Sequence, residues 1–483
     1  MNINLAGFNV DIENIKKLNN FLKNNTSNEE LKTLHWTPET ISASYARISR
    51  DPKPINELRE DARNEIEKTR KSNKAIIFDM GHASIAEHAV FNFDIINISR
   101  YLSEFIQKSR LVSFTEKSQR YVKIGPDNYL PAEFESDQNF LSKYGKLVNE
   151  IFSTYDTIHD ALIPYFTGKF NNITRDTKGY RDVVNLAKED ARYILPLSTY
   201  TQMGMTINAR NLEKLIKKLY SSDLTEFHLL AKNLYESVNS YAPSLIKYIE
   251  PTPYDAKTYP KLKEFFNGAI YAKPRKEVEL INFDKTIEDK IIASLLLKST
   301  DISYKQALYY VKKLSVVEKI KIFDISTEGL SKHDSLLREY ETGSLEFGIL
   351  ISATAFAQLK RHRMTTIVDG EYSPDLGVTI PQSIVEVGKN KLFLKIIDKT
   401  NELYDYAKSR WGSASNYILT NSHRKNIILK CNFRELTHIT RLRSDAHSQW
   451  DVRNISDKMT ALVKLKLPFI ARLLGGKDSF GIK

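Results

Sequence analysis

Cysteine is nearly absent from this chain, since Cys431 is the only one among 483 residues. A single thiol excludes an intramolecular disulfide, a cysteine-rich zinc site and an iron–sulfur cluster, all of which need several sulfur atoms. Long hydrophobic runs are also missing, because the longest nearly apolar stretch, residues 347–359, carries serine and threonine and is too short to span a bilayer. The first residues lack the basic start and apolar core of a signal peptide. We therefore expect a soluble, cytoplasmic protein.

Blocks of consecutive basic residues are absent too, although Lys and Arg number 71 against 59 Asp and Glu, a net charge of +12. A positive excess favours phosphorylated ligands or nucleic acid. Nucleic-acid-binding arms concentrate their positive charge in runs, whereas here it is spread over the whole chain. A nucleic-acid-binding module is therefore supported by net charge alone.

The length of the chain exceeds that of a typical single domain, which predicts several domains or a duplication. Short segments recur in the same order in the two halves of the sequence, as expected for a tandem duplication. Chance similarity between helices of simple composition is the alternative. The matching pairs are residues 41–58 with 291–308, 108–110 with 361–363, and 191–196 with 415–420.

A proline-rich segment, ProThrProTyrAspAlaLysThrTyrPro (251–260), lies between the two halves. Proline at this density is expected to break any helix and to mark a boundary. We therefore predict a first copy over residues 1–250, a linker over 251–274 and a second copy over 275–483.

The hydrophobic pattern predicts both helices and strands, which is a mixed α+β class. Strands are expected where β-branched and aromatic residues gather, over residues 90–98 and 344–351. Helices are expected where apolar residues recur with helical spacing. The helical segments are residues 55–79, 140–166, 210–219, 395–410 and 434–442.

Two polar motifs of the first half could carry chemistry. GlyHisAlaSerIleAlaGluHis (81–88) lacks the spacing of a zinc-binding helix and is better interpreted as a loop that faces a cofactor than as a metal site. Glu116, Ser118 and Arg120 stand at alternate positions, so an extended segment would project them to one face, where hydroxyl and guanidinium bind phosphate. A surface loop and a solvated strand face are the alternatives.

The second half contributes ArgHisArg (361–363), preceded by Gln358. Two guanidinium groups around an imidazole suit a pyrophosphate or the edge of a flavin. A basic surface cluster is the alternative. A predicted helix that ends in ArgLeuArg (441–443) is followed by SerGlnTrpAspValArg (448–453).

Taken in order, these motifs resemble those of the flavin-dependent thymidylate synthases. In the first half the resemblance rests on HisAlaSerIleAlaGluHis, Ser99-Arg100, SerPheThrGluLysSerGlnArgTyr, AlaArgTyrIleLeuPro and AsnAlaArg (208–210). In the second half it rests on residues 358–363 and on the run over 431–453.

The resemblance implies an α+β fold, an antiparallel sheet with long helices, and four copies assembled around flavin sites at subunit interfaces. It implies reductive methylation of dUMP at C5 to dTMP, with methylenetetrahydrofolate as the carbon donor and FAD reduced by NADPH as the hydride source. The composition of the chain agrees with this reaction on one point, its single cysteine. Folate-only thymidylate synthases need a cysteine nucleophile, whereas a flavin carries the difficult chemistry itself.

The resemblance also assigns roles to individual residues. Arg443 would be catalytic, because its charge would stabilise the negative charge that develops on the uracil ring. The implied dUMP ligands are Glu116, Ser118, Arg120, Arg192, Gln358, Arg361 and Arg443. The implied FAD ligands are His82, Ser84, Asn208, Arg210, Arg361, His362, Arg363, Asn432, Arg434 and His438.

Each copy departs from the family pattern where the other keeps it. Copy one has Lys108-Ser109-Arg110 in place of ArgHisArg, and Leu219 in place of the activating arginine. In copy two, the residues that match Glu116, Ser118, Arg120 and Arg192 are Asp369, Glu371, Ser373 and Asn416. A carboxylate at Glu371 would repel a phosphate. These complementary losses predict one composite site per chain, in a homodimer of chains that presents four copies.

Two other functions use the same residues. A flavin-dependent uracil C5 hydroxymethylase or another C5-alkylating enzyme would need the same pocket. A catalytically inactive regulator that binds flavin or nucleotide is favoured by the missing ArgHisArg of copy one.

Overall fold

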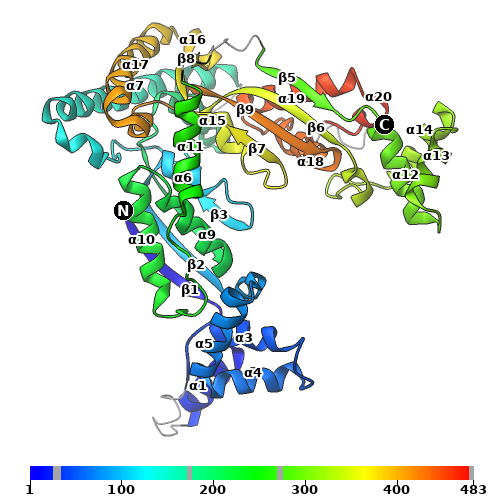
Figure 1. The fold of residues 1–483 in the computed structure, drawn as a ribbon. Coiled ribbons are helices and arrows are strands. Elements are labelled where there is room, and N and C mark those ends of the chain that lie inside the picture. The colour runs from blue at the N-terminus through cyan, green and yellow to red at the C-terminus, as the bar shows by residue number, and fades with distance from the viewer. Residues whose placement is uncertain (25–33, 171–176, 268, 270–275, 478–483) are drawn as a thin grey trace. The chain divides into compact units, whose positions relative to one another are not determined.

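The computed structural model describes residues 1–24, 34–170, 177–267, 269 and 276–477. The chain divides into two compact units, and each unit contains an antiparallel sheet (Figure 1). Unit 1 comprises Met1–Asn149, Leu197–Ile270 and Leu403–Ile418, and unit 2 comprises Glu150–Pro196, Tyr271–Glu402 and Leu419–Lys483.

The sheet of unit 1 has the strand order β1-β2-β4-β3. Its strands are β1 (Asn2–Phe8), β2 (Val90–Ser99), β3 (Val112–Glu116) and β4 (Tyr200–Asn208). Its helices are α1 (Ile12–Asn24), α3 (Glu39–Arg47), α4 (Ile55–Asn64), α5 (Ile66–Lys74), α6 (Arg100–Ile106), α9 (Ala209–Tyr220), α10 (Thr225–Asn239) and α11 (Pro253–Phe265). Short helical turns are η1 (Ala75–Asp79), η2 (Ala83–His88), η3 (Ala132–Ser136) and η6 (Gly412–Tyr417).

One face of this sheet is packed and the other is polar. Along β2 the side chains of Phe91, Phe93 and Ile95 are fully buried and alternate with more exposed positions, as the period of a strand requires. Helices α9 and α10 lie beside the sheet (Figure 1). The pairing of β2 with β4 contains a bulge at Asn97, whose positive φ of 56° is rare for a residue other than glycine.

The sheet of unit 2 has the order β5-β6-β9-β7, with β8 also paired to β9. Its strands are β5 (Val278–Phe283), β6 (Ser344–Ser352), β7 (Thr366–Asp369), β8 (Ser373–Val378) and β9 (His423–Asn432). Its helices are α8 (Lys178–Ala191), η4 (Arg192–Ile194), α12 (Ile287–Ser299), α13 (Tyr304–Val311), α14 (Val316–Ser326), η5 (Arg338–Glu341), α15 (Ala353–Leu359), α16 (Gln382–Glu386), α18 (Phe433–Arg443), α19 (Trp450–Lys464) and α20 (Pro468–Ala471). The long helices α7 (Gln138–Lys169) and α17 (Asn390–Trp411) contribute residues to both units.

The two sheets share the pairing of their main strands, although the sheet of unit 2 has one strand more, β8. In each, the first strand has a register shift and pairs with the second, and the second pairs with the last strand in sequence order, β4 in unit 1 and β9 in unit 2. A serine caps the helix after the second strand, at Ser99 and at Ser352. An asparagine caps the helix after the long central strand, at Asn208 and at Asn432. The mixed α+β class is therefore confirmed, and the two sheets fit two copies of one fold.

Most segments predicted from the sequence form the expected elements. The strands expected over 90–98 and 344–351 are β2 and β6, and the helices expected over 210–219 and 434–442 are α9 and α18. The helices expected over 140–166 and 395–410 lie within α7 and α17.

Two expectations about helices were wrong. The segment 55–79 is not one helix, because the chain leaves helical geometry at Glu65 and its last turn is the π-helical η1. The proline-rich segment does not exclude a helix, since α11 begins there. Pro253 occupies the first helical position, where its missing N–H costs nothing, and Thr252 and Asp255 cap each other. Within the described ranges, no helix is long and apolar enough to cross a membrane.

A buried carboxylate ties together three segments of unit 1. Glu226 in α10 accepts hydrogen bonds from the side chain of Ser99 at 2.6 Å and from the Tyr417 hydroxyl at 2.8 Å. The Ser99 amide also donates to it at 2.7 Å. Burial raises the pKa of Glu226 to about 7, although these hydrogen bonds oppose the shift.

Unit 2 repeats this cluster. Asp451 in α19 accepts hydrogen bonds from Ser352 at 2.6 Å and from the Tyr193 hydroxyl at 2.9 Å. Tyr193 and Tyr417 hold the same place in the repeated run TyrIleLeu, but each belongs to the unit that contains the other copy's sheet. The first half of the sequence therefore supplies the tyrosine of unit 2, and the second half supplies that of unit 1.

Candidate functional site

The junction between β9 and α18 places three polar side chains on one helix face. Asn432 ends the strand, and its side chain accepts a hydrogen bond from the Glu435 amide at 2.8 Å, which starts the helix. Arg434, His438 and Arg441 then follow at spacings of about one helical turn, so they lie above one another on the same side.

These residues line a cavity of about 220 Å³ in unit 2. Asn432, Arg434 and His438, which the sequence predicted as cofactor ligands, are brought together here. The remaining walls come from η5, from the segment before it and from the segment after the ArgHisArg motif. The other lining residues are Ser335, Leu336, Glu341, Met364, Glu435, Thr437 and Arg441.

The two arginines of the cavity are held by the segment before β6. Arg434 donates to the Leu336 carbonyl and to the Glu341 carboxylate, both at 2.7 Å. Arg441 donates to the backbone carbonyl of Asp334, and burial lowers the pKa of its guanidinium. The cavity wall therefore presents two ordered guanidinium groups, together with the carboxyl groups of Glu341 and Glu435.

The three residues of the ArgHisArg motif do not face the same way. His362 is buried with 4% of its surface exposed, whereas Arg361 and Arg363 are exposed. The motif lies in the turn that follows α15, so the imidazole enters the protein interior while its neighbours remain at the surface. The predicted cofactor ligands His362 and Arg361 thus have different surroundings.

Arg443 is fixed by two acceptors. Its Nε donates to Nε2 of His362 at 3.0 Å, and its Nη2 donates to the backbone carbonyl of Gln358 at 3.0 Å. The predicted catalytic arginine and the predicted flavin motif are therefore in direct contact. The amide nitrogen of Gln358 is itself buried and has no hydrogen-bond partner within the described part of the chain.

The other ring nitrogen of His362 faces a carboxylate. Nδ1 lies 3.4 Å from Oε1 of Glu435, and the ring meets that of His438 edge-on at 5.5 Å. Burial, together with the charges of Arg443 and His438, holds the pKa of His362 well below its usual value. Burial raises the pKa of Glu435, while His438 and Arg434 oppose that shift. The imidazole is therefore neutral.

Arg192, a predicted dUMP ligand, also belongs to unit 2. It is buried at the end of α8, and its Nε donates to the Glu189 carbonyl at 3.2 Å. Next to it in sequence, Asp190 accepts a hydrogen bond from Trp450 at 2.8 Å, and burial raises the pKa of this carboxyl to about 6.

The remaining predicted dUMP ligands lie in unit 1. Glu116 ends β3, and its carboxylate accepts hydrogen bonds from Ser103 at 2.7 Å, Gln107 at 2.8 Å and Thr201 at 3.3 Å. Its position is thus set by α6 and β4 rather than by solvent.

Glu116, Ser118 and Arg120 do not share one extended segment, which corrects the sequence interpretation. The strand ends at Glu116, and a turn follows in which the Val122 amide donates to the Ser118 carbonyl at 3.0 Å. Inside this turn, the Ser118 hydroxyl accepts a hydrogen bond from the Arg120 amide at 3.2 Å. A turn of this kind presents a hydroxyl and successive backbone N–H groups together, which also suits an anion.

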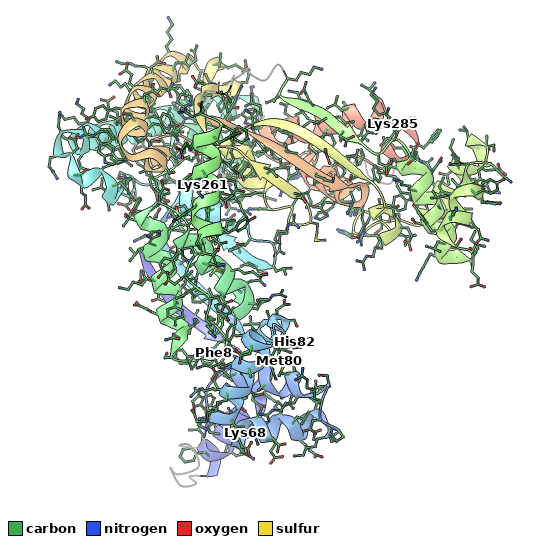
Figure 2. The ribbon with its side chains drawn as sticks, in the orientation of Figure 1. Phe8, Lys68, Met80, His82, Lys261 and Lys285 are labelled. Carbon is green, nitrogen blue, oxygen red and sulfur yellow. The ribbon has the colours of Figure 1, made fainter. Side chains whose placement is uncertain are left out.

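The first-half cofactor residues also lie in unit 1. His82 and Ser84 are exposed at the start of η2, and Figure 2 shows His82 close to Met80. Asn208 caps α9 by accepting from the Asn211 amide at 2.9 Å, and Arg210 forms an ion pair with Glu87.

Sequence reasoning missed Arg441, Glu435 and Glu341 of the cavity. The helical spacing from Arg434 through His438 could have indicated Arg441. No comparable signal exists for Glu341, because it reaches the cavity through tertiary folding only.

Comparisons with known proteins identify the family of the chain. A model of the family described as "Thymidylate synthase complementing protein" matches residues 32–244 and 298–469, well over half of the chain. The chain therefore belongs to this family. The two matched segments fit a tandem form.

Relatives of two lengths are similar to the chain. UPF0159 protein Ta1429 of Thermoplasma acidophilum is 25% identical over 91% of this chain and 95% of its own length. The flavin-dependent thymidylate synthase of Clostridium tetani is 29% identical over 48% of this chain and 90% of its own length. Among solved structures, the flavin-dependent thymidylate synthase of Helicobacter pylori complexed with FAD and dUMP is 17% identical, with a TM-score of 0.29 over 51% of this chain and all (100%) of that one.

Proposed function

We propose that the chain is a flavin-dependent thymidylate synthase that converts dUMP to dTMP by reductive methylation at C5. Methylenetetrahydrofolate would supply the carbon, and FAD reduced by NADPH would supply the hydride. Residues of both copies would form the site, and a homodimer of chains would present the four copies that the family assembles. Relatives named for this activity and the family match support the proposal.

The observation that carries the proposal is the fixed position of Arg443. Two acceptors, His362 and the Gln358 carbonyl, orient its guanidinium before any substrate binds. A cation held in this way can stabilise charge that develops on a uracil ring without having to reorganise during the reaction. Its location beside the cavity of Arg434 and His438 supports a role next to a cofactor.

The residues around this cavity fit a flavin nucleotide. Arg434, Arg441 and His438 line the cavity and offer donors for phosphate or flavin oxygens. Bound FAD would supply the hydride-transfer chemistry. The cavity alone, at about 220 Å³, would enclose part of such a molecule.

The loss of phosphate ligands in copy two has a structural counterpart. Asp369, which matches Glu116, forms an ion pair with the buried Lys425 at 2.7 Å. Lys425 takes the place of Thr201, which hydrogen-bonds Glu116 in copy one. In copy one, Leu219 is fully buried where copy two has Arg443. These differences support one live site per chain rather than two.

The single thiol supports a flavin route over a cysteine route. Cys431 is buried in β9 within the hydrophobic core of unit 2, and burial raises its pKa well above the usual value. A thiolate nucleophile is therefore not formed at neutral pH.

Spectroscopy of the purified protein tests the proposal. The protein should carry the absorbance of bound FAD, and the reduced flavin should be reoxidised when dUMP and methylenetetrahydrofolate are added together. Product analysis should find dTMP. Hydroxymethylated uracil would indicate the related C5-alkylating activity instead, and bound flavin that never turns over would indicate a regulator.

A further inference from the structure

We propose that Glu435 is a positioning residue, which acts through His362 to hold Arg443 in its productive orientation. Nothing in the sequence pattern assigned Glu435 a role. The inference rests on the proposed function for the meaning of Arg443, but the contacts that carry it are independent of any substrate.

The first step concerns the tautomer of His362. The Nε of an arginine always carries a hydrogen, so it can only donate. Because Arg443 Nε donates to His362 Nε2 at 3.0 Å, that ring nitrogen must be unprotonated. The neutral imidazole therefore carries its proton on Nδ1.

The second step concerns the partner of that proton. Nδ1 of the buried ring lies 3.4 Å from Oε1 of Glu435, so a carboxylate is the negative group beside this nitrogen. Glu435 is placed by the start of α18, where its amide donates to Asn432. A carboxylate at this point stabilises the Nδ1–H tautomer, as the outer carboxylates of histidine sites do elsewhere.

The third step concerns charge. The groups packed against the imidazole are Arg443, His438 and Glu435, and Arg434 lies near Glu435 on the same helix. A proton on Nε2 would face the Arg443 guanidinium and remove its acceptor. By favouring the neutral ring with its proton on Nδ1, the Glu435 carboxylate leaves Nε2 free to accept the hydrogen bond from Arg443. The ring then adds no second positive charge beside Arg443.

The experiment reads the tautomer directly by nitrogen NMR of histidine-labelled protein. The His362 signal, identified by its loss in His362→Gln, should show a protonated Nδ1 and an unprotonated Nε2. In Glu435→Ala the Nε2–H form should become populated, whereas Glu435→Gln, which keeps an acceptor oxygen, should resemble the unaltered protein. An Nε2–H signal in the unaltered protein would overturn the inference, whether or not the protein makes dTMP.

Kinetics provide the second measurement. Glu435→Ala should lower kcat by on the order of 10–100-fold, the effect of misplacing a catalytic group by about 1 Å, with little change in dUMP KM or flavin content. Glu435→Gln should recover most of the rate. His362→Gln can accept from Arg443 without titrating, so it should remain active where His362→Phe is not.

Ser109→Ala is the matched control, because Ser109 holds the position of His362 in copy one and should leave the rate unchanged. Equal rates for Glu435→Ala and the unaltered protein, in a preparation that makes dTMP, would refute the positioning role. If no variant makes dTMP, the proposed function fails, and the NMR result still decides the tautomer.

Discussion

Nε and Nη2 of Arg443 donate to protein acceptors, so this side chain is held in place without a ligand. We expect Arg443→Ala to abolish dTMP formation while the protein stays folded and keeps most of its flavin. The interaction lost is one made chiefly in the transition state, so rate falls more than affinity. Stopped-flow flavin oxidation measures it, and an unchanged rate in a folded variant would show that the assignment is wrong.

Matched positions of the two copies give a second test at the same scale. Arg120→Ala should weaken dUMP binding by roughly 1.5–3 kcal/mol, the contribution of a charged hydrogen bond, whereas Ser373→Ala should change little. For FAD the larger effect is expected in copy two instead of copy one. Arg361→Ala should lose the flavin, whereas Lys108→Ala should weaken FAD binding only slightly. Calorimetry on the four variants decides this, and equal effects within either pair contradict a composite site.

Glu226 should make unit 1 less stable as the pH rises. Its carboxyl has a pKa of about 7 in the fold against 4.5 as the ordinary value, so its favourable contribution is complete below pH 4.5 and is lost as the pH rises through 7. The loss is on the order of 3 kcal/mol. The side chain of Glu226→Gln cannot ionise. As the pH rises from 5 to 8, the melting temperature of this variant should therefore increase relative to that of the unaltered protein. Parallel melting curves would contradict this.

At the scale of elements, the strands and long helices were predictable because hydrophobic periodicity records which side is buried. Alternating burial in β2 and the helical stripe of α9 are such cases. Periodicity carries no information about where a helix changes its hydrogen bonding, so the π-helical η1 was missed. The start of α11 was missed because Pro253 stands at the first helical residue, where proline favours a helix, whereas Pro260 lies inside the same helix.

The candidate site was predictable where its residues follow one helix or one motif, as with Asn432, Arg434 and His438. The residues that contact the site from distant parts of the sequence were not predictable. Glu341 and Leu336 reach Arg434 across a long sequence separation. The turn after Glu116 was mistaken for a strand, because alternate polar residues look alike in both.

The asparagine caps can be tested as elements. Asn208→Ala removes the acceptor for the Asn211 amide and should destabilise the first turn of α9 by about 1 kcal/mol, roughly a fivefold change in its opening equilibrium. Hydrogen exchange at Asn211 should be correspondingly faster. Asn208→Ser, which still caps, should restore the slower exchange, and equal rates in all three proteins would exclude a capping role.

For the whole molecule, the complementary losses of the two copies predict half as many binding sites as there are copies. We expect one dUMP and one FAD per chain, because only one combination of copies joins Ser118 and Arg120 with Arg361 and Arg443. Titration calorimetry at known protein concentration measures this number. Two equivalent dUMP sites per chain would contradict the composite arrangement.

Tyr193 and Tyr417, each of which lies in the unit that contains the other copy's sheet, constrain the order in which the units can fold during synthesis. A ribosome releases the first copy long before Tyr417 is made, yet unit 1 needs this residue to hydrogen-bond Glu226. Until then that carboxyl lacks one of its partners, and domains that otherwise fold as they emerge must wait. Unit 1 therefore becomes native only when most of the second copy has left the ribosome, so a nascent chain stalled before residue 403 should lack the protease resistance of the finished unit.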